Sequence, residues 1–597
     1  MINEKGEMYQ FERDAKGQIE KEIGFDGMER TYERSPAGLV ERILRPANRW
    51  TAYQHDALGN IIRTDYFDDT WETFGYDQNG LLTETANEQV TVKLERDISG
   101  QIIKEWQNDH WIASSYDELG NRTQITSSLG AKIDVARNLM GHVTQLTAAQ
   151  KDQSQWAAQM QYNELGQEIE RILPGNVLNQ WQYDVTGRPT NHRVSSQGRH
   201  TRRRVYSWDI NHQLHSVFNE LTGVKTTYSY DEFSNLVSSS REHRFDFLYR
   251  SVDEVGNLYE TQDKTDRVYG AGSRLLETRE AKFAYDEEGN LIQKVESNGD
   301  MWQYAYFGNG MMSKVIRPDN TEVTFKYDAL GRRIEKCSDE KTISFVWDGN
   351  TILHEYVSEK ASTEVEEEKL ITWVYDGESF TPSAKITGEG NYSIICDYLG
   401  TPVEAYDEQD FIPFRYQGQY EDIEIGLYYN RFRYYDPDQG IYTQQDPIGL
   451  NGGLVLYGYV HNTNTWVDVF GLRGNESYPT WMKKKSGFER HHIIPYHLWS
   501  THPLLIKSGL NVNAAMNMMM LPRFQSKHPS KVTHSFFKLG TEHHNIYNRD
   551  MNDVLDEKYE IAKKEKWSTE RMQNEVRDLQ HGTRKKLNNR NTFKGCK

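Results

Sequence analysis

The sequence has few of the features that mark secreted or membrane proteins. Only three cysteines, Cys337, Cys396 and Cys596, occur in 597 residues, which excludes a disulfide framework and suits a reducing compartment. No run of about 18 apolar residues is present, so we expect no membrane span. The first residues, "MINEKGEMYQ", are too charged for a secretory signal peptide. The chain is too long for one hydrophobic core, so two or more domains are expected.

Basic residues are scarce in most of the chain and concentrated at its end. From residue 473 onward there are 23 Lys and Arg against 12 Asp and Glu, a net charge of +11, and 9 of the 19 histidines. The preceding residues carry 47 basic and 76 acidic side chains, a net charge of −29. An acidic body joined to a small basic domain suggests an enclosure with its cargo, or an acidic body that masks a nucleic-acid binder. Two unrelated domains of different pI are the simpler alternative.

The acidic body consists of a short repeat. In copies such as "QHDALGNI" and "SYDELGNR" an acidic or polar residue stands three places before a glycine. The first six such positions are 21, 21, 21, 20 and 20 residues apart: Asp14, Ser35, Asp56, Asp77, Asp97 and Asp117. Alternating aromatic and β-branched residues flank each turn, and Asp and Gly supply the turn chemistry, so each copy predicts a β-hairpin. A single hairpin is marginally stable, so successive hairpins should stack into one long sheet.

The recurring "YDxxGN" frame resembles the YD repeats of the Rhs family, over roughly residues 8 to 392. In that family the repeats form a spiralling β-sheet wound into a hollow shell, found in polymorphic bacterial toxins and in insecticidal toxin complexes. The resemblance implies a mainly β fold in which residues 1–392 form a shell of β-hairpins. Family shells often have more repeats, so this one is expected to be small, truncated, or completed by a second chain or by self-association.

After the last repeat the period breaks into a pattern that contains "GLYYNRFRYYDPDQGIYTQQDPIGLNGG". This segment resembles the Rhs core domain, which is followed by a variable toxin that self-cleavage releases. We assign residues 393–472 to this core, as a plug for the shell. Its paired motifs are "DPIG" at Asp446 and "DVFG" at Asp468, and the resemblance implies cleavage between Leu472 and Arg473.

Two aspartates brought together can act as an acid and a base. A second ionisation beside the first is unfavourable, so the pair can share one proton. One carboxylate of Asp446 and Asp468 would activate water, and the other would donate a proton to the scissile carbonyl. The second motif has Val469 where the family has proline, so a proline-shaped turn is missing. Two ordinary Asp turns are the alternative.

The basic tail contains three short motifs that carry His or Asn. "RHHIIP" begins at Arg490 and is expected to be a strand that the proline ends. "NMMMLP" begins at Asn517 and is expected to be a helix or a loop, whereas "EHHNIYN" begins at Glu542 and should open a helix. Imidazole suits Zn²⁺, Ni²⁺ or Mn²⁺, and with water it also tolerates Mg²⁺.

The order of these motifs resembles the AHH branch of the HNH/endonuclease VII nuclease superfamily, whose small α+β domain is of the ββα-metal type. The resemblance implies that His491 binds a divalent metal ion and that His492 is the general base that deprotonates water. Asn517 would orient the loop. His544 would complete the metal site, with His534 as the alternative ligand.

Together the resemblances imply a bacterial Rhs effector whose shell encloses a C-terminal nuclease, residues 473–597. The nuclease would hydrolyse nucleic acid, DNA in preference to RNA, with Mg, Mn, Ni or Zn as its cofactor. The protein would be made in the bacterial cytoplasm without a signal peptide and secreted or injected by a delivery machinery. Its toxin would act in the cytoplasm of a competitor or host cell, and a cognate immunity protein would protect the producer.

Two other functions are compatible with parts of the sequence. One is a carrier or adhesive shell whose tail binds nucleic acid or a partner without cutting it. The other is a metal-dependent peptidase, but the "HExxH" helix of such zinc enzymes is absent. Single histidine substitutions separate the first alternative from an enzyme, because binding should survive them and cleavage should not.

Overall fold

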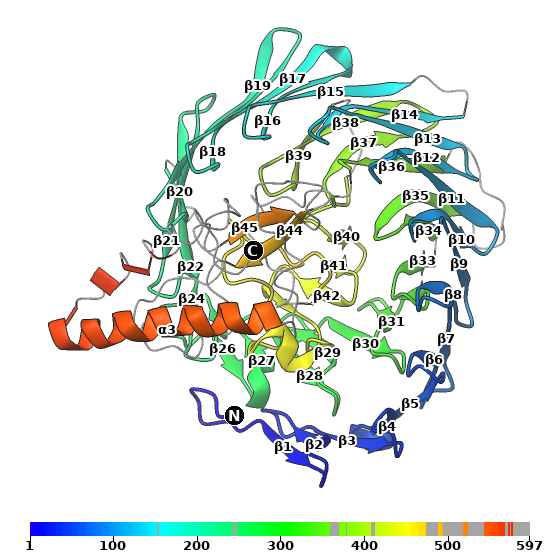
Figure 1. Ribbon diagram of the computed structural model, residues 1–597, viewed down its shortest axis with the longest axis vertical. Coiled ribbons are helices and arrows are strands. Elements are labelled where there is room, and N and C mark those ends of the chain that lie inside the picture. Colours follow the sequence, from blue (N-terminus) through cyan, green and yellow to red (C-terminus); the bar gives the residue numbers. More distant parts are fainter. Residues whose placement is uncertain are drawn as a thin grey trace.

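Strands dominate the computed structural model, which describes residues 1–151, 155–242, 247–339, 341–358, 369–377, 379–406, 412–472, 488–492, 518–522, 542–567, 571–572, 575–576 and 579. Figure 1 shows the strands arranged as a ring around a central segment. A sheet of 23 strands and a sheet of 14 strands form the wall of this ring. The mainly β fold with a wound shell of hairpins is therefore confirmed.

The first sheet is an antiparallel meander in which each strand pairs with the next. Its strands are β1 (Gln10–Arg13), β2 (Ile19–Ile23), β3 (Glu29–Arg34), β4 (Val40–Leu44), β5 (Trp50–His55), β6 (Ile61–Tyr66), β7 (Trp71–Tyr76), β8 (Leu82–Ala86), β9 (Thr91–Arg96), β10 (Ile102–Gln107), β11 (His110–Tyr116), β12 (Arg122–Ser127), β13 (Ala131–Arg137), β14 (Val143–Gln150), β15 (Trp156–Tyr162), β16 (Glu168–Leu173), β17 (Val177–Tyr183), β18 (Pro189–Ser196), β19 (Arg199–Trp208), β20 (Leu214–Asn219), β21 (Val224–Tyr230), β22 (Leu236–Arg241) and β23 (Phe247–Tyr249). We call this sheet the first winding.

The second sheet continues the meander and is called the second winding. Its strands are β26 (Arg267–Tyr269), β27 (Leu275–Thr278), β28 (Ala281–Tyr285), β29 (Leu291–Glu296), β30 (Met301–Tyr306), β31 (Met312–Ile316), β32 (Glu322–Tyr327), β33 (Arg333–Cys337), β34 (Thr342–Asp348), β35 (Thr351–Ser358), β36 (Leu370–Tyr375), β37 (Pro382–Ile386), β38 (Asn391–Cys396) and β39 (Pro402–Tyr406). The sheet thus runs past residue 392, where the sequence suggested that the shell ends.

A short separate pair of strands, β24 (Ser251–Val252) and β25 (Leu258–Tyr259), interrupts the wall between the two windings. The expectation of one uninterrupted sheet is therefore wrong here. The four strands from β23 to β26 are only two or three residues long, too short to carry a continuous ladder of hydrogen bonds across this region.

The repeat folds into hairpins because its aspartate closes each turn. In the copy at Asp56, the carboxylate Oδ1 accepts hydrogen bonds from the N–H groups of Leu58 and Asn60, each at 2.9 Å. The N–H of Gly59 returns to the Asp56 carbonyl at 3.1 Å. The turn at Asp117 has the same bonds. These turns confirm the predicted hairpin chemistry.

In several repeats the tyrosine directly before the first residue of the turn joins one hairpin to the preceding one. The Tyr76 hydroxyl donates to the carbonyl of Ile61 at 3.0 Å, and the Tyr116 hydroxyl donates to that of Ile102 at 2.7 Å. The same type of bond is made by Tyr162, Tyr183, Tyr230, Tyr306 and Tyr327. The hairpin prediction treated this tyrosine only as a strand former, so its connecting role is new.

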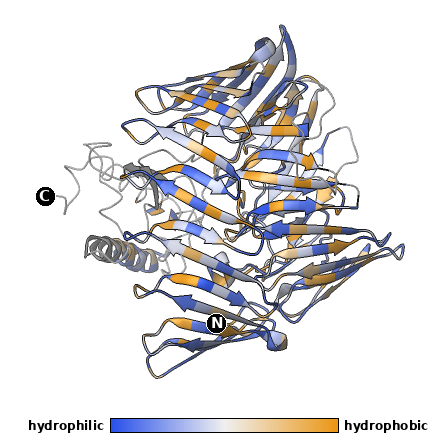
Figure 2. Ribbon diagram, turned by 90° about the vertical axis from the view of Figure 1, so that its right-hand side faces the viewer, coloured by the Kyte–Doolittle hydropathy of each residue, from blue (hydrophilic) through white to orange (hydrophobic). Residues whose placement is uncertain are grey.

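Hydrogen bonds join the two windings between residues that are 205 to 263 positions apart along the chain. The Asn87 side chain donates to the Tyr327 carbonyl at 2.8 Å, across 240 residues. The Trp156 indole donates to the Ser393 hydroxyl at 2.9 Å, across 237 residues. Apolar residues alternate with polar ones along the strands (Figure 2), which lets one face of each strand enter a core. The core between the windings includes Leu146, Ala158, Val374 and Ile386.

Residues 412–472 lie inside the ring (Figure 1) and are called the plug from here on, because β39 and most of β38, which the sequence placed in the plug, belong to the second winding. They form a four-stranded sheet of β40 (Tyr420–Asp422), β41 (Leu427–Asn430), β42 (Arg433–Asp436) and β43 (Ile441–Tyr442). An apolar core joins this sheet to the second winding. The buried Arg333 of the wall also pairs with Asp422 of the plug, with Nη2 3.0 Å from Oδ1. A buried charge needs such a partner, so the plug is anchored by charge as well as by apolar contact.

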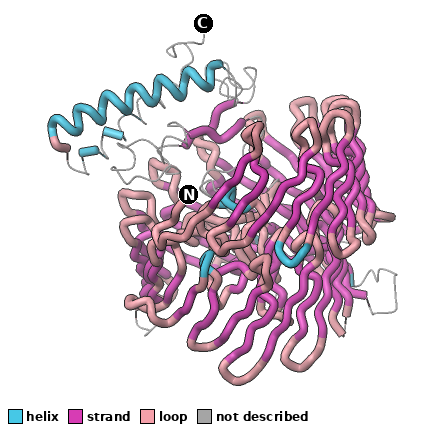
Figure 3. Tube along the Cα trace, turned by 90° about the horizontal axis from the view of Figure 1, so that it is seen from below, coloured by secondary structure: helices cyan, strands magenta, loops and turns pink. Residues whose placement is uncertain are grey.

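The described part of the tail has two strands and one helix. Strand β44 (Phe488–His492) pairs antiparallel with β45 (Met518–Pro522), and helix α3 spans Glu542–Glu565. Figure 3 shows α3 beside the ring and outside its wall. The sequence predicted that the shell encloses the tail, but this helix of the tail is not enclosed. None of the helices in the described ranges is long and apolar enough to cross a membrane.

Candidate functional site

The two aspartates singled out in the sequence meet in the interior of the plug. Asp446 lies after β43 and Asp468 lies near the end of the plug, with exposed fractions of 3% and 7%. Both reach the guanidinium of Arg433, at the start of β42. Its Nη2 atom is 3.0 Å from Asp446 Oδ2 and 3.5 Å from Asp468 Oδ2. Folding therefore brings together two carboxylates that are far apart along the chain.

Asp446 is held by a local turn. Its Oδ1 accepts a hydrogen bond from the N–H of Ile448 at 3.1 Å, and its carbonyl accepts one from Gly449 at 2.9 Å. This is the aspartate turn of the shell repeats, now with the second carboxylate oxygen directed at Arg433. The "DPIG" motif thus supplies both the turn and the carboxylate oxygen that pairs with Arg433.

Asp468 is held by several partners from other parts of the plug. Its Oδ1 accepts from the N–H of Leu472 at 3.0 Å, and its Oδ2 accepts from the Tyr442 hydroxyl at 2.9 Å. Its own N–H donates to the Tyr459 hydroxyl at 3.3 Å, and its carbonyl accepts from the Asn430 side chain at 2.9 Å. The carboxylate is therefore tied directly to the last described residue of the plug.

Arg433 is the member of this site that the sequence analysis missed. Besides the two aspartates, it donates to the carbonyls of Leu456, at 2.9 Å, and Gly471. Its Cζ lies 3.7 Å from the centre of the Tyr442 ring. Since buried arginines need carboxylate partners, the second arginine of "NRFRYYDP" among apolar and aromatic neighbours was the available signal. Its positive charge weakens the repulsion on which the proton-sharing argument depended.

Burial and the nearby charge of Asp468 hold the pKa of Tyr442 well above its ordinary value. Burial also raises the pKa of Tyr459 well above the ordinary range, with Asp468 contributing again. Both hydroxyls therefore keep their protons at neutral pH. Tyr442 remains a hydrogen-bond donor to the carboxylate under all ordinary conditions.

The segment that leads to the predicted cleavage point is fixed by backbone contacts. The N–H of Phe432 donates to the Phe470 carbonyl at 3.2 Å. A side chain at Gly418 would collide with the carbonyl of Val469, so the residue that replaces the family proline packs closely on a glycine. Leu472 is described, whereas Arg473 lies outside the described residues.

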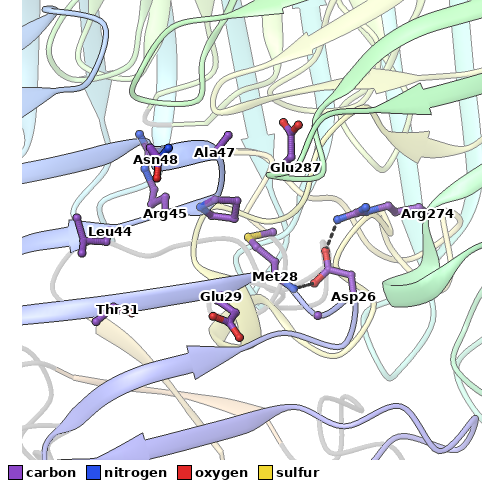
Figure 4. A pocket seen from close by; sticks show the side chains of 12 residues that line it. Asp26, Met28, Glu29, Thr31, Leu44, Arg45, Ala47, Asn48, Arg274 and Glu287 are labelled. Carbon is purple, nitrogen blue, oxygen red and sulfur yellow. Dashed lines mark hydrogen bonds and ion pairs between the residues drawn. The ribbon is translucent and has the colours of Figure 1, made fainter.

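A cavity of about 510 Å³ lies at the seam between the first and second windings (Figure 4). There the Asp26 carboxylate accepts from Arg274 Nη2 at 2.6 Å and from Gln445 Nε2 at 2.7 Å. Gln445 immediately precedes Asp446, so Asp26 connects the first winding to the chain that leads into the aspartate pair. We assign this contact a structural role.

The tail residues predicted to form the nuclease site are only partly described. His491 and His492 end β44, where they are paired in register with Met519 and Met518 of β45. The "MMMLP" segment is therefore a strand, and the expectation of a helix or a loop is wrong there, because pairing with β44 decides its conformation. His544 is the third residue of α3, which confirms that "EHHNIYN" opens a helix. Asn517 and His534 lie outside the described residues.

The backbone order of the tail is strand, strand, helix, as the ββα-metal interpretation requires. Imidazole nitrogens are suitable ligands for divalent transition metals, so His491 and His544 fit the predicted metal in donor type. Within the ranges whose side chains are described, no group of three or more His, Cys, Asp or Glu could hold a metal ion.

Comparison with protein families identifies two different segments of the chain. Residues 169–412 match the family described as Teneurin YD-shell. Residues 473–583 match AHH, described as a nuclease family of the HNH/ENDO VII superfamily with conserved AHH. The first match ends at residue 412 and the second begins at residue 473.

Curated relatives with similar sequences carry names of bacterial toxins. Double-stranded DNA deaminase toxin A of Burkholderia cenocepacia is 26% identical, over 74% of this chain and 34% of its own length. The probable deoxyribonuclease RhsA of Dickeya dadantii is 27% identical, over 64% of this chain and 29% of its own length. The chain thus spans about a third of the length of these relatives.

Solved structures share the fold of the shell. The TcdB2-TccC3-Cdc42 crystal structure matches 78% of this chain and 28% of its own, with a TM-score of 0.56 and 16% sequence identity. The TcdB2-TccC3 structure without the hypervariable C-terminal region matches with a TM-score of 0.54 and 15% identity, over 78% of this chain and 28% of its own. At these identities the comparison establishes the architecture alone.

Proposed function

We propose that this protein is a toxin with a metal-dependent nuclease at its C-terminus. The premise is that the chain joins an Rhs-type YD-repeat shell to a segment of the AHH nuclease family. The observation that carries the proposal is the order of the tail. The His491–His492 pair ends β44, the partner strand β45 begins directly after Asn517, and α3 begins two residues before His544. Toxin and deoxyribonuclease names among the relatives support the same interpretation.

In this proposal His492 accepts a proton from the water that attacks a phosphodiester. His491 and His544 hold a divalent cation, with His534 as the alternative to His544, and Asn517 positions the loop that precedes β45. When bound, the cation stabilises the negative charge that develops on the phosphate and on the leaving oxygen. The net charge of +11 in the tail supplies affinity for phosphates that does not depend on sequence.

We propose DNA as the substrate, because relatives of the shell are named deoxyribonucleases and a DNA deaminase toxin. Since α3 lies outside the ring, enclosure alone would not protect the producing cell. A separate immunity protein would therefore bind the tail, and a delivery system would carry the toxin into the target cell.

The experiment for the nuclease compares histidine variants of the full chain in a plasmid-nicking assay, with Mg²⁺ or with chelator. His492→Ala should lose turnover by a factor on the order of 10² to 10⁴ while it still binds metal, because only the base is removed. His491→Ala and His544→Ala should lose metal affinity in calorimetry. His581→Ala, a tail histidine with no role in the proposal, is the matched control.

Dependence on pH gives a second measurement. A base must be neutral to accept a proton, so nicking should fall as the pH drops through about 6.5, the ordinary pKa of imidazole. If His492→Ala cuts like the wild type, the nuclease assignment fails. If binding to DNA remains in every variant but no cleavage occurs at any pH or metal, the shell is a carrier with a binding tail.

We further propose that the plug releases the tail by hydrolysing the Leu472–Arg473 peptide bond. Water adds to the Leu472 carbonyl carbon while one carboxylate of Asp446 and Asp468 accepts a proton from it. The C–N bond then breaks, its electron pair stays on the Arg473 nitrogen, and the other aspartate supplies a proton. The products are a carboxylate at Leu472 and an amino group at Arg473. The bonds from Asp468 Oδ1 to the Leu472 N–H and from Arg433 to the Gly471 carbonyl support this placement.

Release is tested on a denaturing gel. The wild-type chain should separate into a large fragment and one of about 125 residues, corresponding to residues 473–597. Asp468→Asn and Asp446→Asn should stay intact, whereas Asp438→Asn, an aspartate of the same plug outside the site, should separate like the wild type. An intact wild-type chain would mean that Val469 has disabled the step or that an external trigger is needed.

A further inference from the structure

The two aspartates of the plug are held in unequal ways. Asp446 contacts Arg433 and the N–H of Ile448. Asp468 is farther from Arg433 and receives a phenol instead, with the Tyr442 hydroxyl 2.9 Å from its Oδ2. Its other oxygen, Oδ1, accepts the N–H of Leu472 at 3.0 Å. Since Leu472 precedes the proposed cleavage point, Asp468 is the aspartate whose orientation matters most for the scissile segment.

Asn430 determines which way the phenol points. Its side-chain Nδ2 donates to the Tyr442 hydroxyl oxygen at 2.7 Å and to the Asp468 carbonyl at 2.9 Å. Because the hydroxyl accepts from Asn430, its own proton is left for Asp468 Oδ2. Asn430 and Tyr442 have exposed fractions of 0%, so water does not compete for these bonds.

The ring of Tyr442 has a second contact that fixes it in place. The guanidinium of Arg433 lies against its face, with Cζ 3.7 Å from the ring centre. The same arginine donates to the Gly471 carbonyl next to Leu472. One phenol therefore touches both the carboxylate and the cation of the site, through its hydroxyl and its face respectively.

We propose that Tyr442, oriented by Asn430, is a positioning residue for the self-cleavage of this chain. Its hydroxyl holds Asp468 Oδ2 and thereby keeps Oδ1 on the scissile segment. A hydrogen bond from a phenol to a carboxylate is also shorter and stronger than one between neutral groups. This inference rests on the release step proposed above and adds the group that orients one of its two carboxylates.

The test uses Tyr442→Phe in the full chain, which keeps the ring and removes the hydroxyl. Chains made by cell-free translation are followed on denaturing gels over time between pH 5 and pH 8. We expect cleavage to slow about 10- to 100-fold, the usual effect of losing a hydrogen bond to a charged group. We also expect the acid limb of the pH–rate profile to move to higher pH, because the ionised carboxylate has lost its donor.

Two tyrosines of the same aromatic cluster provide controls. Tyr435 packs on Tyr442 with ring centroids 5.7 Å apart, and none of the hydrogen bonds found for the described residues involves its hydroxyl, so Tyr435→Phe should cleave like the wild type. Tyr459 accepts the backbone N–H of Asp468. Tyr459→Phe should lower the melting temperature and leave the pH profile in place.

The outcomes separate this inference from the release proposal. A wild-type chain that never cleaves overturns both. A cleaving wild type with an unchanged Tyr442→Phe rate at every pH overturns only the role of Tyr442. A slower Tyr442→Phe with an unshifted profile, like that of Tyr459→Phe, means that the hydroxyl only supports the fold and also contradicts the inference.

Discussion

The same turn occurs in both windings of the shell, yet its surroundings differ. In the first winding, apolar residues at the tips of the turns face solvent, and Leu119 is 66% exposed. The other exposed tips are Leu58, Ile98, Leu139, Met140, Leu165, Val185, Ile210 and Phe233. In the second winding, Leu399 occupies the place of Leu119 in its turn and is only 4% exposed, because the plug covers it. Gln417 of the plug donates to its carbonyl at 2.6 Å.

This difference teaches that the repeat motif encodes a turn but not its burial. Local hydrogen bonds are the same at Asp56 and Asp397, where the aspartate accepts from the second and fourth following N–H groups. The energetic consequence of a substitution should therefore depend on the winding. Matched pairs of variants, one from each winding, can measure this dependence directly.

The largest difference is expected for the leucine at the tip of the turn. Leu399→Ala should cost about 2 to 4 kcal/mol, because it removes buried methyl groups and leaves a cavity against the plug. Leu119→Ala should change stability by less than about 0.5 kcal/mol, because its side chain is already in water. Urea unfolding of the two variants measures the difference. Equal effects would show that the plug does not stabilise the second winding.

A smaller difference is expected for the glycine of the turn. Gly17 and Gly331 both have positive φ, +83° and +72°, so alanine at either position should cost about 1 kcal/mol in backbone strain. At Gly331 a Cβ would also lie 2.6 Å from the ring of Phe432 in the plug, whereas no atom is within 4 Å of one at Gly17. Gly331→Ala should therefore destabilise the protein by about 1 kcal/mol more than Gly17→Ala does. If the two variants lose the same stability, the Phe432 ring moves aside freely.

A third difference is expected for the aspartate, and here the sign reverses. Burial raises the pKa of Asp397 to about 6, above the value of about 3.9 in an unfolded chain. The folded state thus favours the neutral acid, and stability is lost as the pH rises from about 4 through 6. Asp397→Asn removes this loss and should stabilise the shell by about 1 to 2 kcal/mol at pH 7 and hardly at all at pH 4. Asn138 and Asn163 accept the same backbone bonds in other repeats, so asparagine is tolerated there.

The matched variant in the first winding is Asp56→Asn. A side-chain hydrogen bond from Asn60 lowers the pKa of Asp56, which is partly exposed. The ionised form is therefore favoured on folding, and its contribution is present at neutral pH and lost as the pH falls below about 4. Asp56→Asn should be slightly less stable than the wild type at pH 7 and equal to it at pH 3. Melting temperatures at the two pH values test both signs, and the same sign for both variants would contradict the comparison.

Much of the candidate site could be predicted because it rests on short motifs. The spacing of "DPIG" and "DVFG" identified Asp446 and Asp468, which the fold places on a common arginine. The "EHHNIYN" helix was also predicted correctly, from the place of this motif in the order of the tail. The "MMMLP" strand was not, because a strand depends on a partner that lies elsewhere in the chain. Arg433 was missed for the same reason, since its carboxylate partners are known only after folding.

The sequence by itself determined the hairpins, their period of about 21 residues and the turn at each aspartate. The turns depend on bonds between residues no more than four positions apart, which local composition encodes. The strands of a hairpin pair residues up to 19 positions apart, still within one repeat. The tertiary structure decided which turns are buried, where the wall is interrupted, and which groups surround Asp468. Those features depend on contacts across as many as 419 residues, and no local pattern states which distant segments will meet. Turns with the same "YDxxG" motif are therefore exposed to solvent in the first winding and covered by the plug in the second.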